Sequence, residues 1–261
     1  SPLVELAGLE ALQSVPASLR IDLGQRFLSG STGALRMAAA RALLPAREGL
    51  SVTRRADLDA ALDEYRAAQE FNADRPESLL NLGNLAVERS ALVEAEAEYR
   101  RALEMHPRFV PTYVNLADLY RRQGREREAE ELLRRGIEIE PGDPSLKHAL
   151  GLSLVRSGAI DEALPLLREA SEQGRADPLY TYVYGVALHS TGAAAAGIDV
   201  LENGHERFPG YAPMLFALAT MQRDAGDLDS ARRYSERLLE VSPGDPGARA
   251  LATELGALPR R

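Results

Sequence analysis

The sequence contains no cysteine and no tryptophan, and Lys147 is its only lysine among 261 residues. Without cysteine the chain cannot form a disulfide, a zinc-thiolate site, a thiol nucleophile or a C-x-x-C-H haem attachment. The four histidines do not form an H-E-x-x-H or H-x-H motif, and there is no carboxylate-rich calcium loop. We therefore expect no metal and no cofactor.

Aromatic residues are also scarce, at 5%, whereas hydrophobic residues make up 45% of the chain and are mostly leucine and alanine. Both residues favour helices, so we expect an all-α protein. No apolar run approaches the ~18 residues of a membrane span, which predicts a soluble protein without membrane insertion. The arginine-rich and alanine-rich composition is typical of a bacterial protein, in either cytoplasm or periplasm. The net charge of −8 argues against nucleic-acid binding.

Motifs for catalysis are missing as well. The one dense stretch of small residues, TGAAAAGID at 191–199, has no strand before it and is best interpreted as a turn and helix start rather than a phosphate loop. Serines occur without a G-x-S-x-G setting, so nucleophilic catalysis has no evident residue. We expect a protein that is not an enzyme.

A period of 34 residues organises most of the chain. Gly124, Gly158, Gly192 and Gly226 recur at this spacing, and such a period indicates a repeat architecture. The eighth and twentieth places of each repeat hold only glycine or alanine, which would let two helices approach closely. Five full repeats follow one another without insertion: 76–109, 110–143, 144–177, 178–211 and 212–245.

Each repeat is predicted to form two antiparallel helices. An Asp-Pro pair, as at Asp143-Pro144, supplies an N-cap and a proline for the first helical turn. The recurrent glycine allows the left-handed residue that ends the first helix. Leu82 and its equivalents, one place before the small residue, are expected in the shared core.

The repeat at 76–109 resembles the tetratricopeptide repeat (TPR) family. Leu79, Leu82, Gly83, Ala95, Tyr99, Ala102 and Pro107 stand at that family's signature places. The resemblance implies a right-handed α-solenoid, a superhelix of helix-turn-helix repeats. The sequence departs from the pattern at Ser90, which replaces the inter-helix glycine, at Gly136 and Gly204, which replace alanine, and at Arg175, which replaces proline.

The ends of the chain differ from the repeats. Residues 1–46 resemble a HEAT-type helical repeat that is truncated at its start, and 47–75 are a transition followed by half a TPR repeat. The stretch LLPAREGLSVT does not resemble that half repeat's first helix. Residues 246–261 are expected to form a capping helix and tail. The apolar stripe Leu6, Leu9 and Leu12 would have one neighbour to cover it, so we expect further protein upstream, which is a possible partner domain in the same chain.

The resemblance places a binding groove along the first helices, at the second, fifth, sixth, ninth, twelfth and thirteenth places. Its N-terminal half would be polar and suited to a peptide backbone or carboxylate, and its C-terminal half apolar. The residues that we expect to bind a peptide or protein partner are Asn81, Asn84, Asn115, Asp118, Arg121, Arg122, His148, Leu152, Arg156, Tyr182, Val186, His189 and Phe216.

Simpler roles compete with binding for these residues. Asn81 and Asn115 can bridge neighbouring helices, and Tyr182 can pack into the next repeat. The carboxylate clamp of chaperone-binding TPR proteins is incomplete because Leu80, Ser145 and Ala149 stand at its cationic places. An asparagine ladder like that of O-GlcNAc transferase stops after two rungs.

The sequence therefore predicts a non-catalytic scaffold module that binds a protein or peptide in its concave groove. One alternative is an accessory C-terminal domain of a larger bacterial enzyme or redox protein, because the order of HEAT-like helices, half repeat and TPR repeats is similar to that of some multihaem cytochromes c. Another alternative is self-association.

Overall fold

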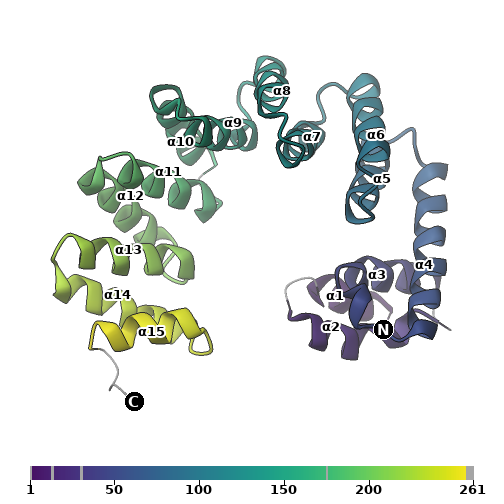
Figure 1. Cartoon of the computed structure of the whole chain (residues 1–261), viewed down its shortest axis with the longest axis horizontal. Helices are drawn as coiled ribbons and strands as arrows, with labels where there is room; N and C mark the ends of the chain where they lie inside the picture. The colour runs from purple at the N-terminus through teal and green to yellow at the C-terminus, as the bar shows by residue number, and fades with distance from the viewer. Residues whose placement is uncertain (1, 13–14, 30–31, 175, 257–261) are drawn as a thin grey trace. The chain divides into compact units, whose positions relative to one another are not determined.

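The structure is a computed structural model that describes residues 2–12, 15–29, 32–174 and 176–256. It contains two compact units, unit 1 (Ser1–Leu119) and unit 2 (Tyr120–Arg261), and the boundary falls inside helix α7. The described residues form helices and turns only, which confirms the all-α prediction (Figure 1). The α-helices are α1 (Pro2–Ala11), α2 (Ala17–Gly24), α3 (Gly33–Leu43), α4 (Val52–Phe71), α5 (Pro76–Glu88), α6 (Leu92–Met105), α7 (Val110–Arg122), α8 (Glu126–Ile139), α9 (Pro144–Ser157), α10 (Ile160–Gln173), α11 (Pro178–Ser190), α12 (Ala194–Arg207), α13 (Ala212–Asp224), α14 (Leu228–Val241) and α15 (Pro246–Glu254).

Helix α4 joins the N-terminal helices to the first full repeat of unit 1. Its residues Leu58, Ala61, Leu62 and Tyr65 belong to the same buried core as residues of α1 and α3. Helix α3 supplies the side chains of Ala39, Ala40, Ala42 and Leu43 to this core and packs along α4. Helix α3 thus takes the place of the first helix that the half repeat lacks. The segment between them is a 3₁₀ helix, Leu44–Gly49, as expected from its unlike sequence.

The N-terminal helices bury one face each. Leu9 of α1 and Leu12, directly after the end of that helix, are buried, and Leu6 packs partly against the same core. On α2, however, Leu19 and Leu23 are 44% and 46% exposed. Apolar residues four places apart therefore do not identify the core face of so short a helix.

Successive helices form stacked hairpins within each unit. Helices α5 and α6 pack together in unit 1, and α9 with α10, α11 with α12, and α13 with α14 pack together in unit 2. Each second helix of unit 2 also contacts the first helix of the next hairpin, and α11 contacts α13. This repeat arrangement confirms the predicted helical hairpins.

The turn inside each repeat has the predicted backbone conformation. Gly124, Gly158, Gly192 and Gly226 have φ of 75°, 81°, 97° and 87°, the left-handed region that glycine enters without a steric penalty. Ser90 takes the same place in the first repeat with φ 60° and is the one non-glycine residue with positive φ in the described segments. Every turn is closed by the same backbone bond, as from Ala159 N to Leu154 O at 2.9 Å.

Aspartates begin three of the first helices. Asp143 accepts hydrogen bonds from the backbone nitrogens of Ser145 and Leu146 at 2.8 and 3.2 Å. Asp177 and Asp245 cap α11 and α15 in the same way. The N-caps predicted from the Asp-Pro pairs are therefore present.

Small residues at the eighth and twentieth places are explained by helix contact. A Cβ on Gly151 would lie 2.7 Å from the Leu167 side chain, and one on Gly185 would lie 2.6 Å from Leu201. At Gly197 the obstacle is backbone, since a Cβ would lie 2.6 Å from the Gly185 carbonyl oxygen. Larger side chains would separate the two helices of a hairpin.

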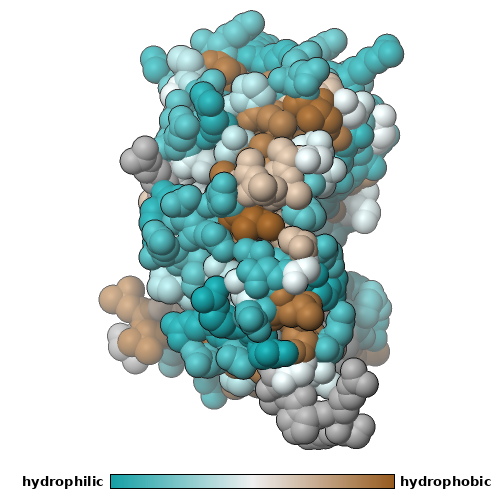
Figure 2. All heavy atoms as spheres, turned by 90° about the vertical axis from the view of Figure 1, so that its left-hand side faces the viewer, coloured by the Kyte–Doolittle hydropathy of each residue, from teal (hydrophilic) through white to brown (hydrophobic). Residues whose placement is uncertain are grey.

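Helix α15 is the last described helix of unit 2. Leu251 of α15, and Leu255 directly after the helix, are buried in one core with Leu238 of α14, whereas Arg249 is exposed. The side of the molecule shown in Figure 2 is mostly hydrophilic, with apolar residues in separate patches. None of the described helices has the length and apolarity needed to cross a membrane.

Candidate functional site

Asn84 is the centre of a polar contact between three helices of unit 1. Its Oδ1 accepts a hydrogen bond from the Tyr99 hydroxyl at 2.6 Å and another from Asn115 Nδ2 at 2.8 Å. Tyr99 is buried on α6, whereas Asn84 on α5 and Asn115 on α7 are half-buried. The structure therefore brings two predicted binding residues into direct contact.

Asn81 makes a second bridge one helical turn earlier on α5. Its Nδ2 donates to Gln69 Oε1 of α4 at 3.1 Å. Asn81 and Asn115 thus do bridge helices, the simpler of the two roles considered for them. Among the described residues, the Nδ2 of Asn84 and the Oδ1 of Asn115 have no hydrogen-bond partner, so an amide nitrogen and an amide oxygen remain unbonded there. Asp118 is half-buried and already has an interaction partner.

Three arginines among the predicted residues belong to unit 2. Arg121 and Arg122 end α7, and each has an interaction partner. Arg156 lies near the end of α9 and is exposed, with its Nη2 3.7 Å from Glu126 Oε2. An exposed pair at this distance contributes little to stability. The Arg156 guanidinium can therefore leave Glu126 for another carboxylate at a small cost in free energy.

His148 is half-buried on α9, with its ring edge-on to that of Tyr180 at a centroid distance of 5.0 Å. Burial lowers the pKa of His148, and the Asp177 carboxylate opposes that shift in part. The burial therefore favours the neutral form of the imidazole. Its Nδ1 is buried and has no hydrogen-bond partner among the described residues.

The apolar candidates lie on three neighbouring helices of unit 2. Tyr182 and Val186 of α11 pack partly against the core that α13 helps to form, and the ring of Tyr182 meets that of Tyr211 edge-on at 6.0 Å. Phe216 of α13 remains 42% exposed. Leu152 and His189 are half-buried on α9 and α11. Tyr182 therefore has the packing role that was considered for it and still reaches the surface.

Two residues beside these candidates were not predicted as binding residues. Leu179 at the start of α11 is an exposed large apolar residue, and its second place in the repeat was the signal available. Lys147 is only 5% exposed, and its Nζ lies 2.8 Å from Glu169 Oε2 and 3.0 Å from Gln173 Oε1. The only lysine of the chain is therefore an internal residue of the α9–α10 hairpin.

A polar network links the helices on the other side of unit 2. Glu202 Oε1 accepts from the Tyr234 hydroxyl at 3.0 Å and from Gln222 Nε2 at 3.1 Å. Burial, together with the hydrogen bond to Glu202, raises the pKa of Tyr234 to about 12. Glu202 of α12 therefore links α13 and α14 through one carboxylate oxygen.

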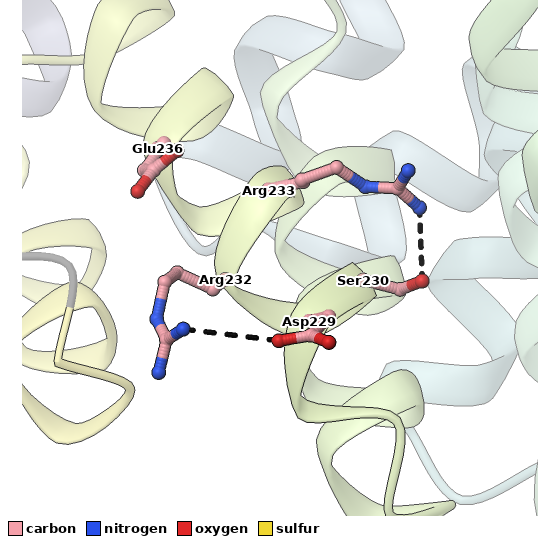
Figure 3. Close-up of a pocket in the computed structure, with 5 residues that line it drawn as sticks. All are labelled: Asp229, Ser230, Arg232, Arg233 and Glu236. Carbon is pink, nitrogen blue, oxygen red and sulfur yellow. Dashed lines mark hydrogen bonds and ion pairs between the residues drawn. The ribbon is translucent and has the colours of Figure 1, made fainter.

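A hollow of about 320 Å³ lies beside α14 (Figure 3). It is lined by Asp229, Ser230, Arg232, Arg233 and Glu236, none of them a predicted binding residue. Arg232 pairs with Asp229 at 3.8 Å, and Arg233 donates to Ser230 Oγ at 2.9 Å. The two arginines point away from each other in Figure 3, so they do not converge on a common ligand.

Within the described segments no three His, Cys, Asp or Glu residues are grouped so as to hold a metal ion.

Sequence comparison identifies the repeats. Two family models of the tetratricopeptide repeat match the chain, one over residues 86–152 and the other over residues 46–108 and 148–212. The chain belongs to the tetratricopeptide repeat family. Together the matches span residues 46–212, from the 3₁₀ helix Leu44–Gly49 to the first residue of α13, and they indicate no catalytic family. No curated protein sequence matches the chain.

Solved TPR structures share the fold. Yeast Tom70 superposes with a TM-score of 0.66 at 16% identity, covering 93% of this chain and 55% of Tom70. MamA from Desulfovibrio magneticus gives 0.55 at 15% identity, covering 66% of this chain and 97% of MamA. YrrB, a TPR protein with an unusual peptide-binding site, gives 0.52 at 21% identity, covering 74% of this chain and 98% of YrrB. At these identities the similarity establishes the fold alone.

Proposed function

We propose that this chain is a non-catalytic scaffold module that binds a protein or peptide partner with the exposed sides of its first helices. The observation that supports the proposal is that amide, aromatic, apolar and charged side chains lie together on those helices. In unit 1, α5 and α7 offer a free amide donor and acceptor at Asn84 and Asn115. In unit 2, α9, α11 and α13 offer Leu152, Tyr182 and Phe216 beside charged residues.

Each unit offers its own chemistry to a partner. An extended backbone presents N–H and C=O groups that a pair of asparagine amides can match. Aromatic and branched side chains on a rigid scaffold contribute most of the energy where a partner's apolar residue covers them. The peptide-binding site of YrrB, another TPR protein, agrees with this use of the fold.

The proposal is tested by partner capture with variants that change one unit at a time. Asn115→Ala removes the amide contact in unit 1, and Tyr182→Ala with Phe216→Ala removes the aromatic contacts in unit 2. A matched control, Leu228→Ala, removes an exposed apolar side chain from the second helix α14. Partner recovery should fall for the first-helix variants and stay unchanged for the control. Equal recovery by all variants would remove the first helices as the binding surface.

Self-association is a second candidate because α1 exposes Leu3 and Val4. Sedimentation of the chain over a range of concentrations separates the two functions. A monomer that captures a partner supports the scaffold, whereas a dimer that Leu3→Ser with Val4→Ser dissociates supports self-association.

A further inference from the structure

Charges are distributed unevenly over unit 2. Among its groove places on α7 to α13, the second, fifth, sixth, ninth, twelfth and thirteenth of each repeat, Asp224 is the one acidic residue. The same places hold four arginines: Arg121, Arg122, Arg156 and Arg223. This arrangement occurs in a chain whose net charge is −8, so the acidic residues of unit 2 are concentrated at other places. We call the described residues at these groove places the first-helix face of unit 2.

The four arginines differ in how fully their charges are compensated. Arg223 is paired closely with Asp224 at 2.8 Å and with Glu254 at 3.0 Å. Arg156 instead has Glu126 at 3.7 Å, with both side chains 43% exposed. Its guanidinium therefore remains accessible to a carboxylate from outside, for which it can offer two parallel N–H donors.

Apolar side chains occupy other places of the same face. Leu152 lies one helical turn before Arg156 on α9, and Val186 and Tyr182 lie on α11. On α13, Phe216 is 42% exposed. A partner segment across these helices would cover apolar residues and meet a cation at one edge.

We propose that the first-helix face of unit 2 binds an acidic, apolar peptide segment of a partner protein. The apolar side chains of the segment pack against Leu152, Tyr182, Val186 and Phe216, and a carboxylate of the segment pairs with Arg156. This inference rests on the proposed binding function and specifies the chemistry of the partner. Complementary charge selects such a segment over a basic one of the same shape, because a like charge opposite Arg156 is repelled.

Three synthetic peptides test the charge preference. They are acetyl-Glu-Leu-Glu-Phe-Glu-Leu-Glu-amide and its analogues with glutamine or lysine in place of every glutamate, each labelled with a fluorophore for anisotropy. The acidic peptide should bind more tightly than the glutamine peptide and the lysine peptide least tightly. The advantage of the acidic peptide should shrink as salt is raised, because exposed charges are screened.

Paired variants of the chain test the residues. Arg156→Gln should weaken binding of the acidic peptide about two- to fivefold, as expected for one exposed charge pair, and leave binding of the glutamine peptide unchanged. Arg156→Lys should retain the preference. The matched control is Arg168→Gln on the second helix α10, whose guanidinium lies 3.6 Å from Glu172 and is likewise exposed. Phe216→Ala should weaken all three peptides, and Leu228→Ala none of them.

Several outcomes would overturn the inference without removing the proposed function. Equal or tighter binding of the lysine peptide would show that the face does not select acidic segments. Failure of all three peptides, while Tyr182→Ala with Phe216→Ala still abolishes partner capture, would show that the partner's chemistry is different. A dimer that Arg156→Gln and Phe216→Ala dissociate would identify a second copy of the chain as the occupant.

Discussion

Replacing Ser90 by glycine should stabilise unit 1, because Ser90 is the residue that departs from the glycine rule of the repeat turns. It has φ 60° and is exposed, with no side-chain hydrogen bond among the described residues. The turn itself is the same as in the other repeats, since Ala91 N bonds to Ala86 O at 2.8 Å. The substitution therefore removes strain without removing a contact.

The expected gain is the difference between two effects. A left-handed residue with a Cβ costs about 1–2 kcal/mol, whereas the greater freedom of glycine in the unfolded chain costs roughly 0.5–1 kcal/mol. Ser90→Gly should therefore raise the free energy of unfolding by roughly 0.5–1 kcal/mol, the balance of these two terms. The reverse change, Gly158→Ser at φ 81° with no neighbour within 4 Å of its Cβ position, should lower it by a similar amount.

Urea unfolding followed by far-ultraviolet circular dichroism measures both variants against the parent chain. The midpoints should shift in opposite directions with unchanged slopes. If Ser90→Gly were neutral or destabilising and Gly158→Ser were harmless, the left-handed turn would not be what selects glycine at this place, and the account of the period would be wrong.

Three further predictions concern unit 2. Gly197→Ala should destabilise unit 2 by about 1–3 kcal/mol in thermal unfolding, because the new Cβ would press on the backbone of α11. The control Gly210→Ala, which has open space around its Cβ position, should have a far smaller effect. Equal effects of the two variants would refute the close approach of α11 and α12. Lys147→Met should leave the stability unchanged or raise it, whereas Glu169→Ala, which removes the partner of Lys147, should lower it. Labelling of Lys147 by an amine-reactive reagent should be as slow as unfolding. Rapid labelling of Lys147 in the folded chain would show that it is not buried. The pKa of Tyr234 in the folded chain is raised to about 12 and lies above its value in the unfolded chain. The contribution of Tyr234 to stability is therefore complete below pH ~10 and is lost as the pH rises toward 12. Tyr234→Phe should reduce this alkaline loss of stability, and an unchanged pH profile of unfolding would contradict the assignment.

The repeat architecture was predictable because its determinants are local and periodic. Glycine at 124, 158, 192 and 226 and small residues at the eighth and twentieth places report backbone conformation and helix distance directly. The pairing of α3 with α4 was not predictable in this way. The connection between these helices runs through a 3₁₀ segment and lies outside the period, so that shared core residues such as Ala39 and Leu62 reveal the pairing only in three dimensions.

The candidate site was predictable only as a set of places. The repeat register identified Asn84 and Asn115, but it did not decide whether their amides bond to each other or to a ligand, and the structure shows one hydrogen bond between them. Gln69, the partner of Asn81, was missed because it belongs to a half repeat whose places were not assigned to a groove. The burial of Lys147 was also missed, since it depends on carboxylate and amide partners that lie 22 and 26 residues away on α10.

The central claim, that a partner covers the first helices, is tested most directly by hydroxyl-radical footprinting of the chain with and without its bound partner. Tyr182 and Phe216 should be protected from oxidation in the complex. Phe71, which is 86% exposed at the end of α4 and is no part of the proposed surface, should be oxidised equally in both states. Protection of second-helix residues such as Leu228 and Tyr234, with Tyr182 and Phe216 unchanged, would contradict the account.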